Sequence, residues 1–172
     1  LVGLASRDSL ILEFSPTMIS LILAGKVGSS IASELGSMRV SEQLDALEIM
    51  GVNSASFLIL PKIIATIFFF PFLVIISMGI GMIGAWIGGL SVDVTTADFL
   101  SGLKYDFNPF YVTYSLIKTV VFAFIIASVS SYFGYFTKGG SIAVGKSSTK
   151  AVVSSSILIL VCNFILTNLL LA

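Results

Sequence analysis

The clearest candidate for chemistry in this sequence is the segment GSIAVGKS, residues 140–147. It matches the pattern G-x-x-x-x-G-K-[ST], in which backbone N–H groups, a lysine and a hydroxyl hold nucleotide phosphates. The nucleotide-binding residues would be Gly140, Gly145, Lys146 and Ser147. This chemistry also needs a preceding strand and an α/β domain, but long apolar segments lie on both sides. We interpret the pattern as a chance match in a Gly- and Ser-rich loop and expect no nucleotide in this chain.

Four charged side chains fall inside or near long apolar segments: Glu13, Lys26, Glu34 and Lys118. A charge at the centre of a bilayer costs about 2.5–3.5 kcal/mol, so such residues usually pair with one another or face a wet cavity. Glu13 and Glu34 lie near enough to segment ends to reach the membrane surface instead. Lys26 and Lys118 lie deeper, and we expect internal partners for both.

A third group of charges lies in the segment 34–51, which holds five of the eighteen Lys, Arg, Asp and Glu residues. Acidic residues recur there every three positions and apolar residues recur at helical spacing, which predicts an amphipathic helix over 41–50. Ser37 or Ser41 would cap this helix and Gly51 would end it. The residues that form the pattern are Val40, Glu42, Leu44, Asp45, Leu47 and Glu48.

Such a helix either rests on lipid headgroups or binds another protein. Helices that lie on a membrane surface are usually rich in Lys and Arg, whereas this one is acidic. An anionic lipid surface would repel it. An acidic helix with an apolar stripe fits a groove on a partner protein better.

The composition indicates which elements position these residues. The chain has 172 residues, of which 56% are hydrophobic and only 10% charged, against about 25% charged in soluble domains. Its mean hydropathy is +1.08. It has no histidine, one cysteine (Cys162) and zero net charge, which argues against an internal disulfide, a Cys/His metal site and nucleic-acid binding. We predict an all-α integral membrane protein.

Four apolar segments are long enough to cross a hydrocarbon layer of about 30 Å. They are approximately Ser9–Gly36, Phe57–Leu90, Pro109–Phe136 and Ala151–Leu171. Pro71 lies inside the second and predicts a kink, because proline removes one helical hydrogen bond. About four transmembrane helices are therefore expected.

The connections between these segments predict the orientation. Residues 137–150 carry three lysines and no acid, which is typical of the cytoplasmic side. Alternation then places 37–56 in the cytoplasm as well and 91–108 outside. In the outer connection, Thr95 and Asp98 predict a short helix over 95–103.

Small residues recur four positions apart, which lets membrane helices approach closely. These rows either pack within one bundle or form a subunit interface, and both interpretations stay open. They are Gly28, Ala32 and Gly36, then Gly81 and Ala85, Gly84 and Gly88, and Ala85 and Gly89.

The segment 34–52 resembles the signature of the MlaE family, the permease subunits of bacterial ABC transporters that move phospholipid between the two membranes of the envelope. Further similarity lies in Ala24–Gly28, Leu116–Phe122 and Gly145–Val153. The resemblance covers essentially all 172 residues and about the C-terminal two thirds of a family member. It implies one membrane permease domain over 1–172, without the family's N-terminal interfacial helix and first span.

The resemblance also implies a mechanism. The 41–50 helix would be a coupling helix that docks into a separate ATPase subunit, which binds ATP and Mg, so this chain would carry no cofactor and would not be an enzyme. A second permease copy and a periplasmic MCE-domain protein would complete a complex in a Gram-negative inner membrane. The docking residues would be Arg39, Glu42, Gln43, Leu44, Asp45, Leu47, Glu48 and Gly51.

The segment Leu12–Pro16 resembles the family's Arg-Glu-Phe-Gly-Pro stretch beside the lipid cavity. Glu13 and Pro16 carry over as lipid-cavity candidates, whereas Leu12 replaces the arginine. The family's usual Asp is Asn163, and its usual Arg residues are Lys26, Lys146 and Lys150.

Two other functions compete with this one. An ion-coupled secondary transporter or channel would place Lys26, Glu13 and Glu34 along an ion path. A P-loop NTPase would bind nucleotide through Lys146.

Overall fold

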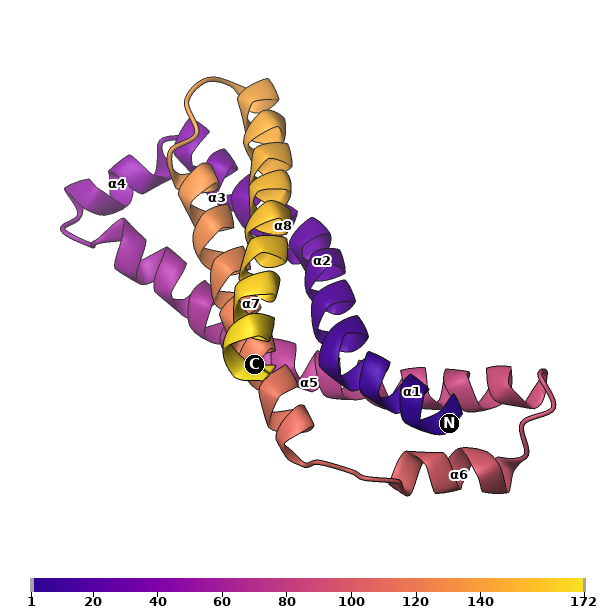
Figure 1. The fold of residues 1–172 in the computed structure, drawn as a ribbon. Helices are drawn as coiled ribbons and strands as arrows, with labels where there is room; N and C mark the ends of the chain where they lie inside the picture. The colour runs from indigo at the N-terminus through magenta and orange to yellow at the C-terminus, as the bar shows by residue number, and fades with distance from the viewer. Residues whose placement is uncertain (1, 172) are drawn as a thin grey trace.

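The computed structural model describes residues 2–171, which form helices joined by short loops, with no strand among them (Figure 1). The all-α prediction is therefore confirmed, and the predicted domain limits, residues 1 and 172, lie just outside the described residues. In chain order the elements are α1 (Val2–Ser9), η1 (Leu10–Met18), α2 (Ile19–Leu23), η2 (Ala24–Gly28), α3 (Ser29–Val40), α4 (Gln43–Ile49), α5 (Ser54–Leu90), α6 (Thr96–Lys104), α7 (Phe110–Tyr135) and α8 (Ser141–Leu171).

The first span is one continuous helix, Val2–Val40, with two π-helical stretches, η1 and η2. Pro16 lies inside η1. Proline has no N–H and its ring clashes with the carbonyl four residues earlier, so a wider turn accommodates it. π-Helical turns of this kind often occur at functional sites.

Four helices are long and apolar enough to cross a membrane, as predicted: Val2–Val40, Ser54–Leu90, Phe110–Tyr135 and Ser141–Leu171. The last begins ten residues before the predicted start at Ala151. Its first turns are rich in Ser, Thr and Lys. Because these residues have low hydropathy, the sequence did not predict them as part of the membrane helix. Their backbone hydrogen bonds lie within the helix all the same, so α8 continues past the apolar region.

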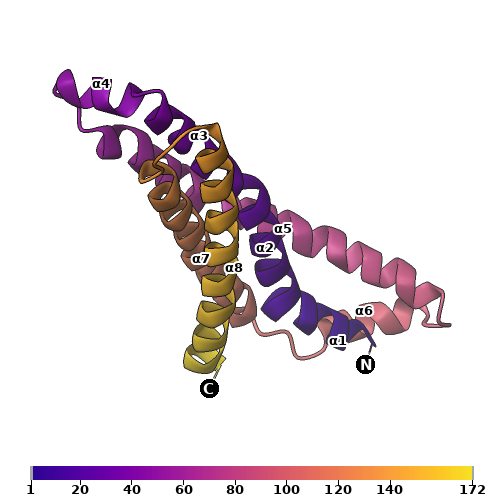
Figure 2. The same ribbon diagram turned by 90° about the horizontal axis from the view of Figure 1, so that it is seen from above.

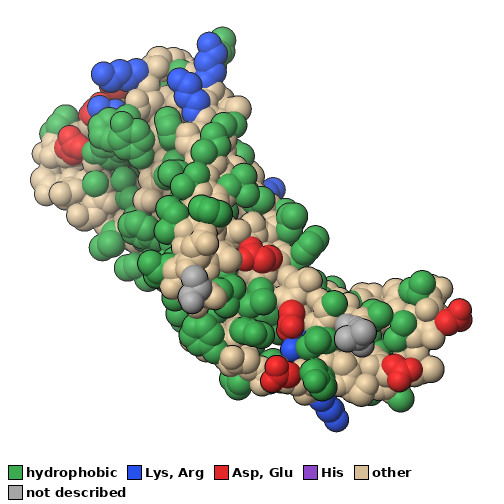
Figure 3. Space-filling model, viewed as in Figure 1, with side chains coloured by type: hydrophobic (Ala, Val, Ile, Leu, Met, Phe, Trp, Pro, Cys, Tyr) green, Lys and Arg blue, Asp and Glu red, His purple; other side chains and the backbone are tan. Residues whose placement is uncertain are grey.

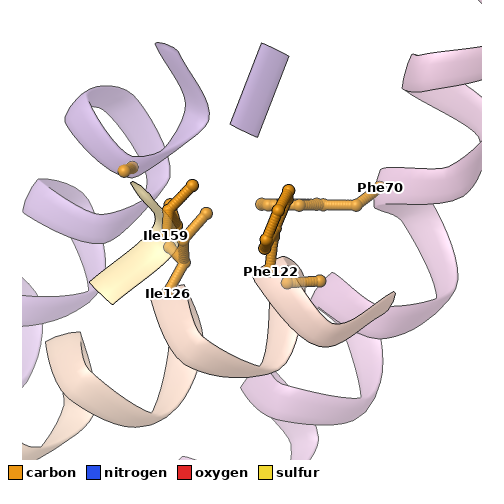
Figure 4. Packing of buried hydrophobic residues seen from close by; sticks show 6 residues of the cluster. Phe70, Phe122, Ile126 and Ile159 are labelled. Carbon is orange, nitrogen blue, oxygen red and sulfur yellow. The ribbon is translucent and has the colours of Figure 1, made fainter. Parts of the chain in front are cut away.

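Helix α7 is the centre of the bundle and packs against α3, α5 and α8. Its buried side chains Phe122 and Ile126 form a core with Phe70 of α5 and Ile159 of α8 (Figure 4). The outward faces of α5 and α8 carry exposed apolar residues such as Phe68 and Phe164, as expected for surfaces that face lipid.

The two ends of the molecule differ. Helix α4 and the α7–α8 connection lie at one end, while α6 packs beside α1 on an arm at the other (Figures 1 and 2). Lys and Arg side chains gather at the α4 end (Figure 3). This arrangement agrees with the predicted placement of 37–56 and 137–150 on the same side.

The arm is joined by close backbone contact and by a buried arginine. A Cβ on Gly3 would clash with the Phe99 carbonyl of α6. Arg7 is 2% exposed and donates to the carbonyls of Leu103 and Tyr105 at 2.8 Å each. The predicted outer helix over 95–103 is α6, and the Thr95 hydroxyl caps it by accepting from the Asp98 N–H at 3.2 Å.

The rows of small residues differ in whether they pack within the chain. A Cβ on Gly28 would lie 2.8 Å from the Ser130 hydroxyl, and one on Gly36 would lie 3.1 Å from that of Thr137. That row packs within the chain. On α5, by contrast, a Cβ on Gly84 or on Gly88 would meet no atom of another element within 4 Å among the described residues.

Candidate functional site

A polar cluster lies inside the bundle, around Glu13 of η1 and Lys118 of α7. The Lys118 side chain is fully buried, and its Nζ lies 2.7 Å from Glu13 Oε1. Lys118 therefore has the internal partner that we expected. Glu13 pairs inward instead of reaching the membrane surface, although 41% of its side chain stays exposed.

Three further helical side chains complete the cluster. Asn163 of α8 donates to Glu13 Oε2 at 3.0 Å, and the Thr167 hydroxyl donates to Glu13 Oε1 at 3.1 Å. Tyr114 donates to Thr167 at 3.1 Å, and its ring lies 4.6 Å from Lys118 Nζ. Hydrogen bonds of this kind offset the cost of removing an ion pair from water, so the cluster joins η1, α7 and α8.

Pro16, the other lipid-cavity candidate, is buried beside this cluster. The Leu12 carbonyl in the same π-helical stretch lies 3.4 Å from Lys118 Nζ. The segment Leu12–Pro16 thus meets Lys118 through a backbone carbonyl as well as through Glu13.

Tyr114 and Thr167 were missed as site residues, and Asn163 entered only as a departure from the family pattern. A signal for them exists in the sequence. Glu13 and Thr17, Tyr114 and Lys118, and Asn163 and Thr167 are three polar pairs, each spaced by four within an apolar span. Residues four apart share one face of a helix, so the three pairs mark three facing stripes.

The structure does not bring the other intramembrane charges to this cluster. The expected internal pair of Lys26 is wrong for this chain, because Lys26 is exposed and forms no ion pair within residues 2–171. Ala24 and Gly28, on either side of it, are buried, so Lys26 lies on the opposite face. Glu34 is exposed and pairs with Lys62 of α5 at 2.7 Å.

The predicted helix in the charged segment is α4, two residues shorter at its start. Ser41 does not cap it, because its hydroxyl donates to the Ser37 carbonyl of the preceding helix at 2.9 Å. Glu42 occupies the cap position with a left-handed backbone, φ 61°. Gly51 ends α4 at φ +80°, with N–H bonds from Gly51 to Glu48 and from Val52 to Leu47, as predicted.

One face of α4 makes contacts within the chain. Leu44 is completely buried. The Glu48 carboxylate accepts hydrogen bonds from Ser54 of α5 and Tyr135 of α7, both at 3.0 Å. These two hydroxyls lower the pKa of Glu48 below its ordinary value. We call Glu48, Ser54 and Tyr135 the Glu48 tie.

Arg39, at the end of α3, supports the same face. It pairs with Asp45 at 2.8 Å and lies 5.8 Å from the ring centre of Tyr135. The opposite face of α4 and the residues after it are accessible: Ile49 is 88% and Met50 69% exposed. Gln43 is exposed and Leu47 half-buried.

The segment 140–147 adopts a different shape from a phosphate-binding loop. The helix α8 begins at Ser141, so Gly145, Lys146 and Ser147 lie in its first two turns. Backbone N–H groups beyond the first turn bond within a helix. They are not available to surround a phosphate.

Comparison with known proteins decides the family. The model of the family "Permease MlaE" matches residues 1–169. The chain belongs to the MlaE permease family. A probable ABC transporter permease protein of Rickettsia bellii is 42% identical over 162 residues, which are 94% of this chain and 62% of that protein.

Two further relatives resemble the chain over a similar share of its length. A probable ABC transporter permease protein of Synechocystis is 36% identical over 94% of this chain and 62% of its own length. The chloroplastic protein TRIGALACTOSYLDIACYLGLYCEROL 1 of Arabidopsis thaliana is 35% identical over 91% of this chain and 45% of its own. The chain thus spans about three fifths of the length of the bacterial relatives.

Proposed function

We propose that this MlaE permease moves phospholipid between the two membranes of a Gram-negative envelope, powered by a separate ATPase subunit. The observation that carries the proposal is the Glu13 carboxylate, which is held by Lys118 at 2.7 Å inside apolar spans and yet is 41% exposed. A partly open polar group within an apolar surface suits an amphiphile, because a headgroup and acyl chains need both. A relative named after a galactosyl diacylglycerol supports a diacylglycerol-based lipid as the substrate, although that lipid carries sugars in place of a phosphate.

An apolar groove beside the first span could hold the acyl chains of the lipid. A groove of about 460 Å³ lies between α2 and α5, lined by Ile19, Ile22 and Ile76 among others. Lys26 follows Ile22 by one helical turn, and both are exposed. A lysine near mid-span is costly against lipid, so we propose that this face lines a wet cavity shared with a second permease copy.

The ATPase would bind the exposed side of α4. Some of the residues predicted for docking already have partners within the chain: Leu44 is buried, Asp45 pairs with Arg39, and Glu48 accepts from Tyr135. Others, such as Glu42 and Gln43, are exposed. We propose that the partner contacts Ile49 and Met50, and that the Glu48 tie transmits its movement to α7. Since α7 also carries Lys118, one rigid helix would connect the ATPase contact with the lipid site. A periplasmic MCE-domain protein would receive or deliver the lipid at the α6 end.

The test uses the full-length permease expressed with its neighbouring transporter subunits. Ile49→Asp should abolish co-purification of the ATPase, because it places a charge in an apolar contact. Val92→Asp is the matched control, since Val92 is also apolar and 71% exposed but lies between α5 and α6 at the other end of the molecule. An unchanged complex with Ile49→Asp contradicts the docking surface.

Lipid transport is tested separately. Glu13→Gln should lower ATP-dependent transfer of labelled phospholipid from proteoliposomes by roughly tenfold or more while the ATPase still co-purifies. Transfer driven by an ion gradient without ATP would instead favour an ion-coupled carrier.

A further inference from the structure

Three lysines line one pocket at the α4 end of the molecule. The pocket has a volume of about 380 Å³ and lies between the last turns of α7 and the first turns of α8. Lys138, Lys146 and Lys150 all line it, and the Lys and Arg side chains at this end are visible in Figure 3. Two of the three are the lysines that the sequence places in and just after the P-loop-like pattern.

The positive charge of this pocket is not neutralised by the chain. No Asp or Glu occurs among residues 137–150 or in the lining of the pocket. Within the described residues, the ion pairs of the chain use other cations: Arg7, Arg39, Lys62 and Lys118. An anionic group would therefore meet three lysines and no opposing acid.

An apolar groove adjoins the pocket and shares two of its lysines. It has a volume of about 610 Å³ and runs along one face of α8 from Ile142 through Lys146 and Lys150 to Val153. Ile142 is 77% and Val153 52% exposed. A site that needs both a cation cluster and an apolar channel is thus continuous along this helix.

Aromatic side chains flank the other side of the pocket. Tyr132 and Phe136 line it, are each 60% exposed, and have ring centres 5.0 Å apart. Aromatic residues at the end of a span are typical of the level of the lipid headgroups. This position in the fold suits a pocket that meets a phosphate at the bilayer surface.

We propose that this pocket binds the headgroup of an anionic phospholipid from the leaflet on the α4 side, with one acyl chain along the α8 groove. The lysine ammonium groups would hold the phosphate, as basic pockets between membrane helices do. This site is separate from the Glu13 cluster, which lies nearer the opposite end of the helices and exposes a carboxylate. The proposal does not depend on lipid transport.

The experiment measures which lipids stay bound to the full-length permease complex. The complex is reconstituted in vesicles of equal parts phosphatidylglycerol and phosphatidylcholine, extracted in mild detergent, and its bound lipids are quantified by mass spectrometry. The wild type should retain phosphatidylglycerol preferentially. In Lys146→Gln/Lys150→Gln this preference should fall roughly tenfold or more, because each lysine near an anionic lipid contributes to binding.

Two controls make the result specific. Lys146→Arg/Lys150→Arg keeps both charges and should retain the preference, and Lys104→Gln removes a lysine from α6 at the other end of the molecule. An unchanged preference in the double Gln variant overturns the proposal, as does an equal loss in Lys104→Gln. So does loss of the preference in Glu13→Gln alone, which would place the lipid in the Glu13 cluster. Loss of the ATPase with unchanged lipid would show that the lysines bind protein.

Discussion

The carboxylates of Glu13 and Glu48 are both held by hydrogen bonds, but one lies inside the helix bundle and the other at its end. Each carboxylate accepts hydrogen bonds from two neighbouring helices, and α7 takes part in both sites, through the Tyr135 hydroxyl at Glu48 and through the Lys118 ammonium at Glu13. At Glu13 the partner lysine is fully buried, whereas Glu48 lies on an exposed helix at the end of the bundle. Burial determines how much these hydrogen bonds contribute to stability, because water competes for the exposed carboxylate of Glu48. The buried cluster should hold the bundle together, and the exposed tie should be free to break and re-form.

The largest expected effect comes from breaking the buried cluster. Lys118→Met leaves the Glu13 carboxylate without its ion-pair partner and should lower the free energy of unfolding by about 3 kcal/mol, the low end for a buried pair because Glu13 is partly exposed and keeps its bonds to Asn163 and Thr167. The measurement is denaturant unfolding of the purified permease in detergent. Lys104→Met on α6 is the control and should change stability by less than about 0.5 kcal/mol. Equal effects of the two variants would show that burial does not distinguish these lysines.

A second variant tests the close packing of α3 against α7. Gly134→Ala would place a Cβ 2.8 Å from the Ala32 carbonyl and 2.9 Å from Leu35 Cβ. Such overpacking should cost about 1–3 kcal/mol, measured by the same unfolding assay. Gly84→Ala, whose Cβ would meet no atom of another element within 4 Å among the described residues, should be neutral or slightly stabilising. A stable Gly134→Ala variant would mean that the two helices are not in rigid contact.

A smaller effect is expected at the Glu48 tie. Tyr135→Phe removes one hydroxyl and should raise hydrogen exchange in residues 43–53 about threefold to tenfold while α7 and α8 stay protected. Tyr132→Phe is the matched control, because Tyr132 lies on the same helix and is 60% exposed. If hydrogen exchange also rises in α7 and α8, the Glu48 tie stabilises the whole bundle and does not open locally.

The smallest effect is the pH dependence of the same tie. The Ser54 and Tyr135 hydroxyls and Arg39 lower the pKa of Glu48 in the folded protein. A lowered carboxyl pKa stabilises the folded state fully above the ordinary Glu value, and this stabilisation is lost as pH falls from there through the lowered value. Protection of residues 43–53 should therefore decline only in acid. Glu48→Gln should remove this pH dependence of protection. If protection still declines in acid in that variant, another group is responsible for the decline.

Much of the fold was predictable from composition and spacing. Long apolar segments become membrane helices, because a bilayer offers backbone groups no other partner, and Thr95 and Gly51 correctly marked the start of α6 and the end of α4. The start of α8 was not predictable, since its polar turns carry no hydropathy signal. Arg7 was missed because its partners are the carbonyls of Leu103 and Tyr105, almost one hundred residues away.

The sequence by itself determined the class of protein, the number of spans, the family and the presence of unusual charges. Only the tertiary structure decided which charges meet: Lys118 with Glu13, Glu34 with Lys62, and Lys26 with none among the described residues. It also decided that Glu48 faces α7 and that Ile49 faces outward. The physical reason is that hydropathy and helical period are local, whereas the partner of a side chain depends on how the helices rotate and pack.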